Sequence, residues 1–270
     1  MTQKTLFSRP LIKLFCIIVI PIAAYLAFLG FPWLLAAVGK PSVRFYVTII
    51  SRSDPIRDRV TVEYAIRDLC RLGPEAKNAV PVLKNLLQNK ELMESKNAVN
   101  DYEAAETIEM ILLALGKTGR EAKDAIPEIL LAANHPIPDV REHALIALGG
   151  IGLGTPEVLA TLTKALKGKD ESYRENCVCA YAAWALGKLG PEAKAAVPAL
   201  IEVSKKVDYG KFLLAQDARW ALSKIGTPEA LAAANPNLGD GLPEDLLQLM
   251  KPAHVSRSLW ESPPFWVRDP

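Results

Sequence analysis

One block of sequence recurs along this chain and constrains its fold more than any other feature. It reads Gly-Pro-Glu-Ala-Lys-Asn-Ala-Val-Pro from Gly73, Gly-Arg-Glu-Ala-Lys-Asp-Ala-Ile-Pro from Gly119 and Gly-Pro-Glu-Ala-Lys-Ala-Ala-Val-Pro from Gly190. Shorter forms, which carry Thr-Pro-Glu instead, follow Gly152 and Gly226. These five anchor glycines are 33 to 46 residues apart, a spacing that indicates an array of small repeats rather than one globular core.

The residues before each anchor glycine keep one register, which predicts a helix in every unit. A leucine stands four residues before the glycine and a small residue stands three before it. The leucines are Leu69, Leu115, Leu148, Leu186 and Leu222, and the small residues are Cys70, Gly116, Gly149, Gly187 and Ser223. Spacings of three and four place apolar side chains on one helix face. The anchor glycine suits the left-handed conformation that follows a helix end.

A second helix is predicted after each turn. Pro81, Pro127 and Pro198 stand where it should begin. Proline is favoured at the first helical position because the N–H that it lacks would have no partner within the helix there. Each unit is then an antiparallel helical hairpin, too small to bury its own apolar face. Stacking the units buries it, so we expect an all-α fold, an α-solenoid of about five two-helix repeats over residues 57–234.

The run Asp139-Val-Arg-Glu-His-Ala-Leu-Ile-Ala-Leu-Gly-Gly-Ile-Gly resembles a HEAT repeat of the short bacterial kind, which is also found in phycobilisome lyases. The segment from Ala180 to Leu200 is similar, and the resemblance covers about residues 57–234. Such repeats mostly form surfaces that bind other proteins. The resemblance therefore implies an interaction scaffold, and its alternative is a bilin-lyase-like accessory or maturation factor.

The amino-terminal part predicts a membrane anchor. Residues 14–38 are 25 residues without a charge, and as a helix they would reach roughly 37 Å, enough to cross a bilayer core of about 30 Å. A short basic leader, residues 1–13, precedes them, and a linker over residues 39–56 follows. A cleaved signal peptide is the alternative, although its apolar region is usually shorter. Cations flank both ends, so the positive-inside rule only marginally favours repeats outside the cytoplasm.

The charge balance argues against nucleic acid as a partner. The whole chain has a net charge of +2, and residues 57–234 carry 23 Lys and Arg against 24 Asp and Glu. A protein that binds DNA or RNA through its phosphates needs a clear excess of cations. A protein or peptide partner is expected instead.

No motif for catalysis, a cofactor or a metal is found in the sequence. Cys177 and Cys179 lie two apart on one predicted helix, so their side chains diverge. The deoxyhypusine hydroxylases resemble this fold and hold two irons through His-Glu dipeptides, whereas this chain has a single pair in reverse order, Glu142-His143. We therefore expect no enzyme, no cofactor and no metal site.

The predicted binding surface is the exposed face of the second helices, which usually line the concave side of such a stack. Its members are Asn85, Gln88, Leu131, Asn134, Thr161, Lys164, Glu202 and Lys205. They mix polar, cationic and acidic groups, which suits a protein or peptide. For any one of them, a solvated helix face is an equally good interpretation. The proline-rich tail, residues 235–270, is expected to cap the last repeat.

Overall fold

The computed structural model describes residues 42–94, 98–168, 172–205 and 212–234. The chain divides into two compact units, residues 1–45 and 46–270. Of the first unit the structure describes residues 42–45 alone, so the architecture below is that of the second. In the described part of the chain every regular element is a helix and none is a strand, which confirms the predicted all-α class.

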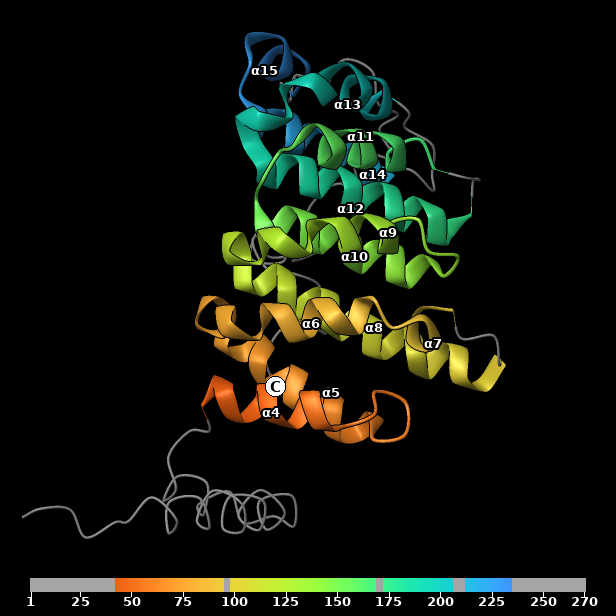
Figure 1. Cartoon of the computed structure of the whole chain (residues 1–270). Coiled ribbons are helices and arrows are strands. Elements are labelled where there is room, and N and C mark those ends of the chain that lie inside the picture. Colours follow the sequence, from red (N-terminus) through yellow and green to blue (C-terminus); the bar gives the residue numbers. More distant parts are fainter. Residues whose placement is uncertain (1–41, 95–97, 169–171, 206–211, 235–270) are drawn as a thin grey trace, which may run out of the picture. The chain divides into compact units, whose positions relative to one another are not determined.

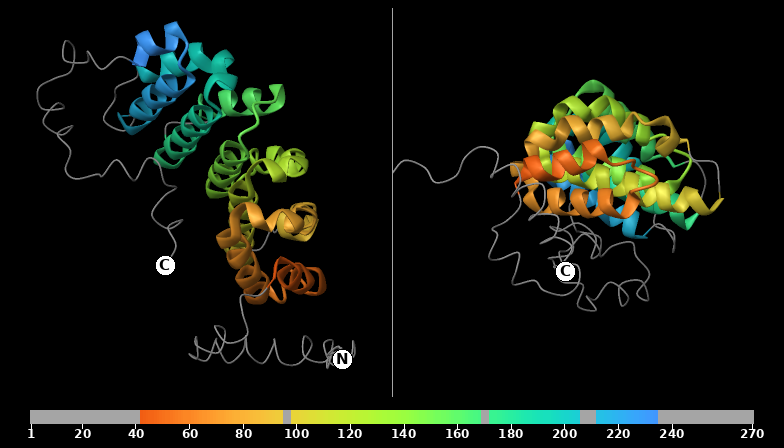
Figure 2. Two further views of the ribbon diagram at one scale, coloured as in Figure 1. Left: turned by 90° about the vertical axis from the view of Figure 1, so that its left-hand side faces the viewer. Right: turned by 60° about the horizontal axis from the view of Figure 1, so that its bottom comes forward.

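The described helices form five successive pairs, each with a first helix, a turn and a second helix (Figure 1). The pairs are α5 (Arg59–Leu72) with α6 (Val80–Leu87), α8 (Ala98–Thr118) with α9 (Ile126–Ala132), α10 (Pro138–Ile151) with α11 (Pro156–Ala165), α12 (Tyr173–Leu189) with α13 (Val197–Ser204), and α14 (Phe212–Ile225) with α15 (Pro228–Ala234). Successive first helices contact one another, while α6, α9, α11 and α13 each pack on the first helix of the following pair. The first and second helices therefore form two layers (Figure 2).

The core lies between these layers and follows the predicted register. All five leucines of the register are buried, and each contributes roughly 1.5–3 kcal/mol through burial. The small residues bring neighbouring first helices together, because a Cβ built on Gly116 would lie 2.9 Å from the Cα of Ala147. A Cβ on Gly149 would lie equally close to the Cα of Ala185. The apolar pattern and the small residues thus act together to stack the repeats.

The anchor glycines all have positive φ angles, between 54° and 73°, as their place after a helix predicts. Gly152 is left-handed, with ψ at 38°. Gly73 and Gly190 differ from the prediction, since their ψ angles of −125° and −132° lie in a region that residues with a Cβ avoid. This conformation leads directly into a short 3-10 helix, η2 (Gly73–Ala79) or η4 (Gly190–Ala196).

The 3-10 helices occupy the turn between the helices of three pairs. Besides η2 and η4, η3 (Gly119–Ala125) joins α8 to α9. In each of them two alanines three residues apart are buried, because the tight helix places them on the same side. The alanines are Ala76, Ala79, Ala122, Ala125, Ala193 and Ala196. The recurring sequence block is therefore a packed element and not an exposed loop.

Two short helices lie outside the pairs. α7 (Lys90–Met93) follows α6, and Asn89 caps it by accepting a hydrogen bond from the backbone N–H of Leu92. α4 (Val43–Arg52) occupies most of the segment expected to be a linker over residues 39–56. Tyr46 and Ile50, four residues apart on one face of α4, are buried, which explains why this segment is helical.

None of the described helices combines the length and the apolar character that a membrane span requires. The predicted leader 1–13, the predicted membrane segment 14–38 and the tail 235–270 lie outside the described residues.

Candidate functional site

The eight residues of the predicted binding surface lie on or directly after the second helices. Asn85 lies on α6, Leu131 on α9, Thr161 and Lys164 on α11, and Glu202 on α13, while Gln88, Asn134 and Lys205 follow the ends of α6, α9 and α13 by one or two residues. Thr161 is half-buried and the other seven are exposed. Leu131 is the least expected of them, because an apolar side chain that is 72% exposed makes contact with little of the protein itself.

Hydrogen bonds between repeats hold part of this surface. The Gln88 amide, directly after α6, donates to Glu128 Oε1 on α9 over 2.6 Å. Further along, Lys164 Nζ on α11 donates to Asn134 Oδ1 over 3.3 Å. The structure thus brings the second helices α6, α9 and α11 together at the predicted surface.

A largely apolar hollow of about 660 Å³ adjoins this surface at α11. Pro156, Leu159 and Ala160 line it from α11, and Ala195 lines it from η4. Lys164 and Lys167, both exposed, stand among these apolar residues. Apolar walls next to cationic side chains resemble the core and rim of a protein interface. Of the eight predicted residues, Lys164 lines this hollow.

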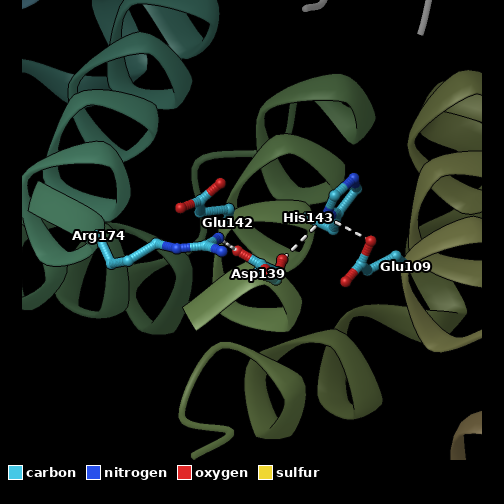
Figure 3. Close-up of a pocket in the computed structure, with 5 residues that line it drawn as sticks. All are labelled: Glu109, Asp139, Glu142, His143 and Arg174. Carbon is cyan, nitrogen blue, oxygen red and sulfur yellow. Dashed lines mark hydrogen bonds and ion pairs between the residues drawn. The ribbon is translucent and has the colours of Figure 1, made fainter. Parts of the chain in front are cut away.

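A second hollow, of about 250 Å³, is lined entirely by charged or titratable residues (Figure 3). Glu109 comes from α8, Asp139, Glu142 and His143 come from the first two turns of α10, and Arg174 comes from the start of α12. Asp139 and Arg174 form an ion pair. The His143 Nδ1–H donates to the backbone carbonyl of Asp139 over 2.8 Å, and Glu109 Oε2 lies 3.8 Å from the same nitrogen.

The electrostatics of this hollow follow from burial. Desolvation raises the pKa of Glu109 and of Glu142 to about 7, and the negative charge of Asp139 adds to both shifts. Burial lowers the pKa of His143, so that its ring is neutral at pH 7. The hollow therefore holds two carboxyl groups that change charge near neutral pH.

Sequence reasoning missed this cluster, although a signal for it was present. Glu63, Glu109 and Glu142 each stand ten residues before an anchor glycine, so the stack places them at equivalent points of α5, α8 and α10. The first of them is satisfied, because Glu63 Oε1 accepts from Arg59 over 2.9 Å and from Thr107 over 2.8 Å. The repeat register by itself indicates this row of glutamates.

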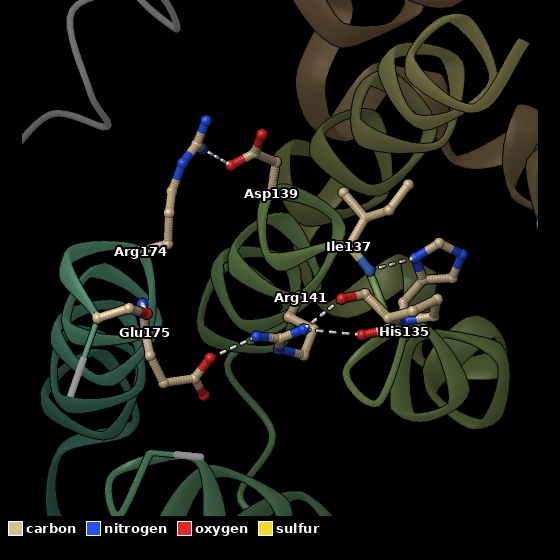
Figure 4. Close-up of polar contacts among 8 residues, drawn as sticks. His135, Ile137, Asp139, Arg141, Arg174 and Glu175 are labelled. Atoms are coloured by element: carbon tan, nitrogen blue, oxygen red, sulfur yellow. Dashed lines mark hydrogen bonds and ion pairs between the residues drawn. The ribbon is translucent and has the colours of Figure 1, made fainter. Parts of the chain in front are cut away.

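A buried ion pair lies beside the charged hollow and is structural (Figure 4). Arg141 Nη2 on α10 donates to Glu175 Oε2 on α12 over 2.5 Å, and Arg141 Nη1 donates to the backbone carbonyls of His135 and Pro136. His135 accepts at Nδ1 from the N–H of Ile137 and donates from Nε2 to the carbonyl of Met93. These contacts tie two first helices to the turn before α10.

Among the described residues no group of three or more His, Cys, Asp and Glu is arranged to hold a metal ion. The carboxylates around His143 therefore do not form a metal centre of that kind.

Comparison with known proteins agrees with this architecture. Residues 96–180 match HEAT repeats, and residues 178–206 match the PBS lyase HEAT-like repeat. Within residues 96–206 the chain is thus similar to HEAT and HEAT-like repeats. No curated protein matches the sequence.

Among the solved structures that match this chain are two man-made proteins. An engineered protein from a structural genomics consortium is 18% identical, with a TM-score of 0.42 over 71% of this chain and 84% of that chain. A designed armadillo repeat protein, solved in complex with the peptide (KR)4, is 15% identical, with a TM-score of 0.49 over 77% of this chain and 96% of that chain.

Proposed function

We propose that this protein is a membrane-anchored scaffold or adaptor that binds another protein through its second-helix surface and carries out no catalysis. One observation carries the proposal: exposed polar, charged and apolar side chains line the second helices of four successive repeats. Helical repeat folds of this kind typically serve protein interaction, since stacked hairpins present an extended surface. Residues 14–38 supply the anchor in this proposal, and the repeats face the outside of the cytoplasm.

The cationic positions of this surface offer the sharpest test. Lys164 and Lys205 are exposed, the first on α11 and the second directly after α13. Reversing both charges with K164E and K205E leaves the core untouched but removes complementarity to an acidic partner patch, which typically costs part of the affinity and of the association rate. The matched control reverses two exposed lysines of the 3-10 helices, K123E and K194E.

The experiment captures the full chain from detergent-solubilised membranes and identifies co-purifying proteins by mass spectrometry. We expect a stoichiometric partner with the wild type and with K123E/K194E, and its loss with K164E/K205E. Equal recovery with both double variants would place the partner elsewhere on the molecule. Recovery of the chain in the soluble fraction would remove the anchor from the proposal.

The alternative function, a bilin-lyase-like accessory or maturation factor, is favoured by one observation, the match of residues 178–206 to the PBS lyase HEAT-like repeat. The same purification distinguishes it. A visible chromophore on the purified chain, or a pigment newly attached to a co-purifying protein, would support the alternative and exclude a purely non-catalytic scaffold.

A further inference from the structure

The charged hollow between α8, α10 and α12 has an excess of negative charge. Three carboxyl groups, those of Glu109, Asp139 and Glu142, face a single guanidinium, that of Arg174. That guanidinium is already paired with Asp139. Glu109 and Glu142 are therefore left without a cationic side chain of their own in the described structure, apart from the neutral His143 ring 3.8 Å from Glu109.

Glu142 gives a second indication, besides the surplus of negative charge, that a ligand binds in this hollow. Its side chain lines the hollow and the residue is 8% exposed, yet among the described residues no hydrogen bond or ion pair reaches its carboxyl group. The Glu142 carboxyl oxygens face the open hollow, since the buried side-chain atoms without a partner are, among the described residues, Glu128 Oε2 and Arg141 Nε. Glu63, at the same register on α5, two first helices along the stack, shows the paired arrangement.

The lining residues select the chemistry of the ligand. An anion is excluded by the surplus of carboxylates. A metal ion is disfavoured because no described group of three ligands has the required arrangement. Figure 3 shows Glu142 toward α12 and Glu109 toward α8, with Asp139 and His143 between them. Two carboxylates on opposite sides of a small hollow suit a guanidinium, whose planar group carries five N–H donors pointing in several directions.

We propose that this hollow, the α8–α10 carboxylate site, binds the guanidinium group of an arginine side chain on a partner protein, held between Glu109 and Glu142. The inference rests on the proposed function in that it gives the scaffold a specific contact. It concerns the first-helix layer, so the site is separate from the second-helix surface.

Binding of a guanidinium at this site is coupled to the release of protons from Glu109 and Glu142. Burial raises the pKa of both glutamates to about 7, and the charge of Glu109 adds to the shift of Glu142. The other groups that act on them are Glu106 from α8, Asp139, Arg141 and His143 from α10, and Arg174 from α12. A guanidinium stabilises the ionised carboxylates, so its arrival lowers both pKa values and releases protons. Affinity therefore rises with pH through 7 and levels off near pH 8.

The test uses the full chain in detergent and two small probes, N-acetyl-arginine methylamide and its neutral isostere N-acetyl-citrulline methylamide. The chain contains three histidines, so spectra of histidine-labelled protein are simple, and His143 reports on the site while His135 serves as an internal reference. We expect the arginine probe to shift the His143 ring signals and leave those of His135 in place. Its affinity should be about tenfold higher at pH 8 than at pH 6 for one ionising carboxyl group, and up to about 100-fold for two.

The variants E142Q and E109Q should each weaken arginine binding at pH 8 at least tenfold, whereas E157Q, an exposed glutamate of α11, should bind as the wild type does. An unchanged His135 signal shows that each variant is folded. Equal binding of the two probes to the wild type overturns the proposal without any variant. So does an affinity that fails to rise with pH.

The two proposals fail separately in these experiments. If the protein binds the arginine probe but captures no partner from membranes, the arginine site is supported and the scaffold function is contradicted. If K164E/K205E loses the partner but the protein does not bind the arginine probe, the scaffold function is supported and the arginine site is contradicted.

Discussion

The small residues three positions before each anchor glycine set how closely the first helices approach. A Cβ on Gly187 would lie 2.3 Å from a ring atom of Trp220, and one on Gly149 would lie 2.9 Å from the Cα of Ala185. The register makes this requirement visible in the sequence. The residues that these glycines contact could not be predicted from the sequence, because they lie more than 30 residues away and depend on how the repeats stack.

Gly149→Ala is expected to destabilise the protein by about 1–3 kcal/mol, the usual cost of overpacking. Alanine gains up to about 1 kcal/mol over glycine in a helix, so a simple propensity argument predicts the opposite sign. Chemical denaturation followed by circular dichroism measures the difference. The control Ser223→Ala, at the same register in the last repeat, should change the free energy of unfolding by about 0.5 kcal/mol or less. A stabilised G149A protein would contradict the close approach.

Glu175→Ala is expected to cost about 3–5 kcal/mol in the free energy of unfolding, because it leaves the buried Arg141 guanidinium without its carboxylate. The matched exposed pair is Arg120 with Glu192, whose side chains are 68% and 46% accessible. Arg120→Ala should therefore cost about 0–1 kcal/mol. The same denaturation measurement compares the two, and similar small costs would show that Arg141 finds another partner.

At the scale of elements, the helix pairs follow the predicted pattern while two kinds of segment differ from it. The proline at the second position of α6, α9 and α13 marks their starts, as the sequence indicates. The 3-10 helices were not predicted, because their alanines become buried only when neighbouring repeats pack around them. α4 was predicted as a linker, although the spacing of Tyr46 and Ile50 on one face of a helix was available in the sequence.

The contact of α8 with α10 predicts a dependence of stability on pH. Burial raises the pKa of Glu109 and Glu142 to about 7 in the folded state, above the ordinary value of 4.5. The folded state then binds more protons than the unfolded state between these values, so this contribution to stability is complete below about pH 4.5 and is lost as the pH rises through 7. Asp217 on α14, whose pKa burial also raises to about 7, acts in the same direction.

The double variant E109Q/E142Q should therefore lose less stability than the wild type between pH 5 and pH 8. Thermal unfolding midpoints at the two pH values measure this, with E157Q as the control that follows the wild type. Some loss should remain because Asp217 is unchanged. An equal decrease in the midpoint for the double variant and the wild type would mean that the two glutamates are solvated in the folded state.

At the scale of the whole molecule, stacking turns local sequence repeats into surfaces that no single repeat possesses. The array and the exposure of seven of the eight surface residues could be anticipated from the register alone. The register indicates the row of Glu63, Glu109 and Glu142, but the hollow itself depends on the stack, because its lining residues come from three first helices.

Site-specific photocrosslinking in living cells tests the central claim, that the second-helix surface binds a protein partner, most directly. A benzoylphenylalanine replaces Leu131 on α9, which is 72% exposed, or Tyr64 on α5, a first-helix residue that is 50% exposed. The account predicts a discrete crosslinked protein from position 131 and none from position 64. A product from position 64 alone, or equal products from both positions, would contradict it.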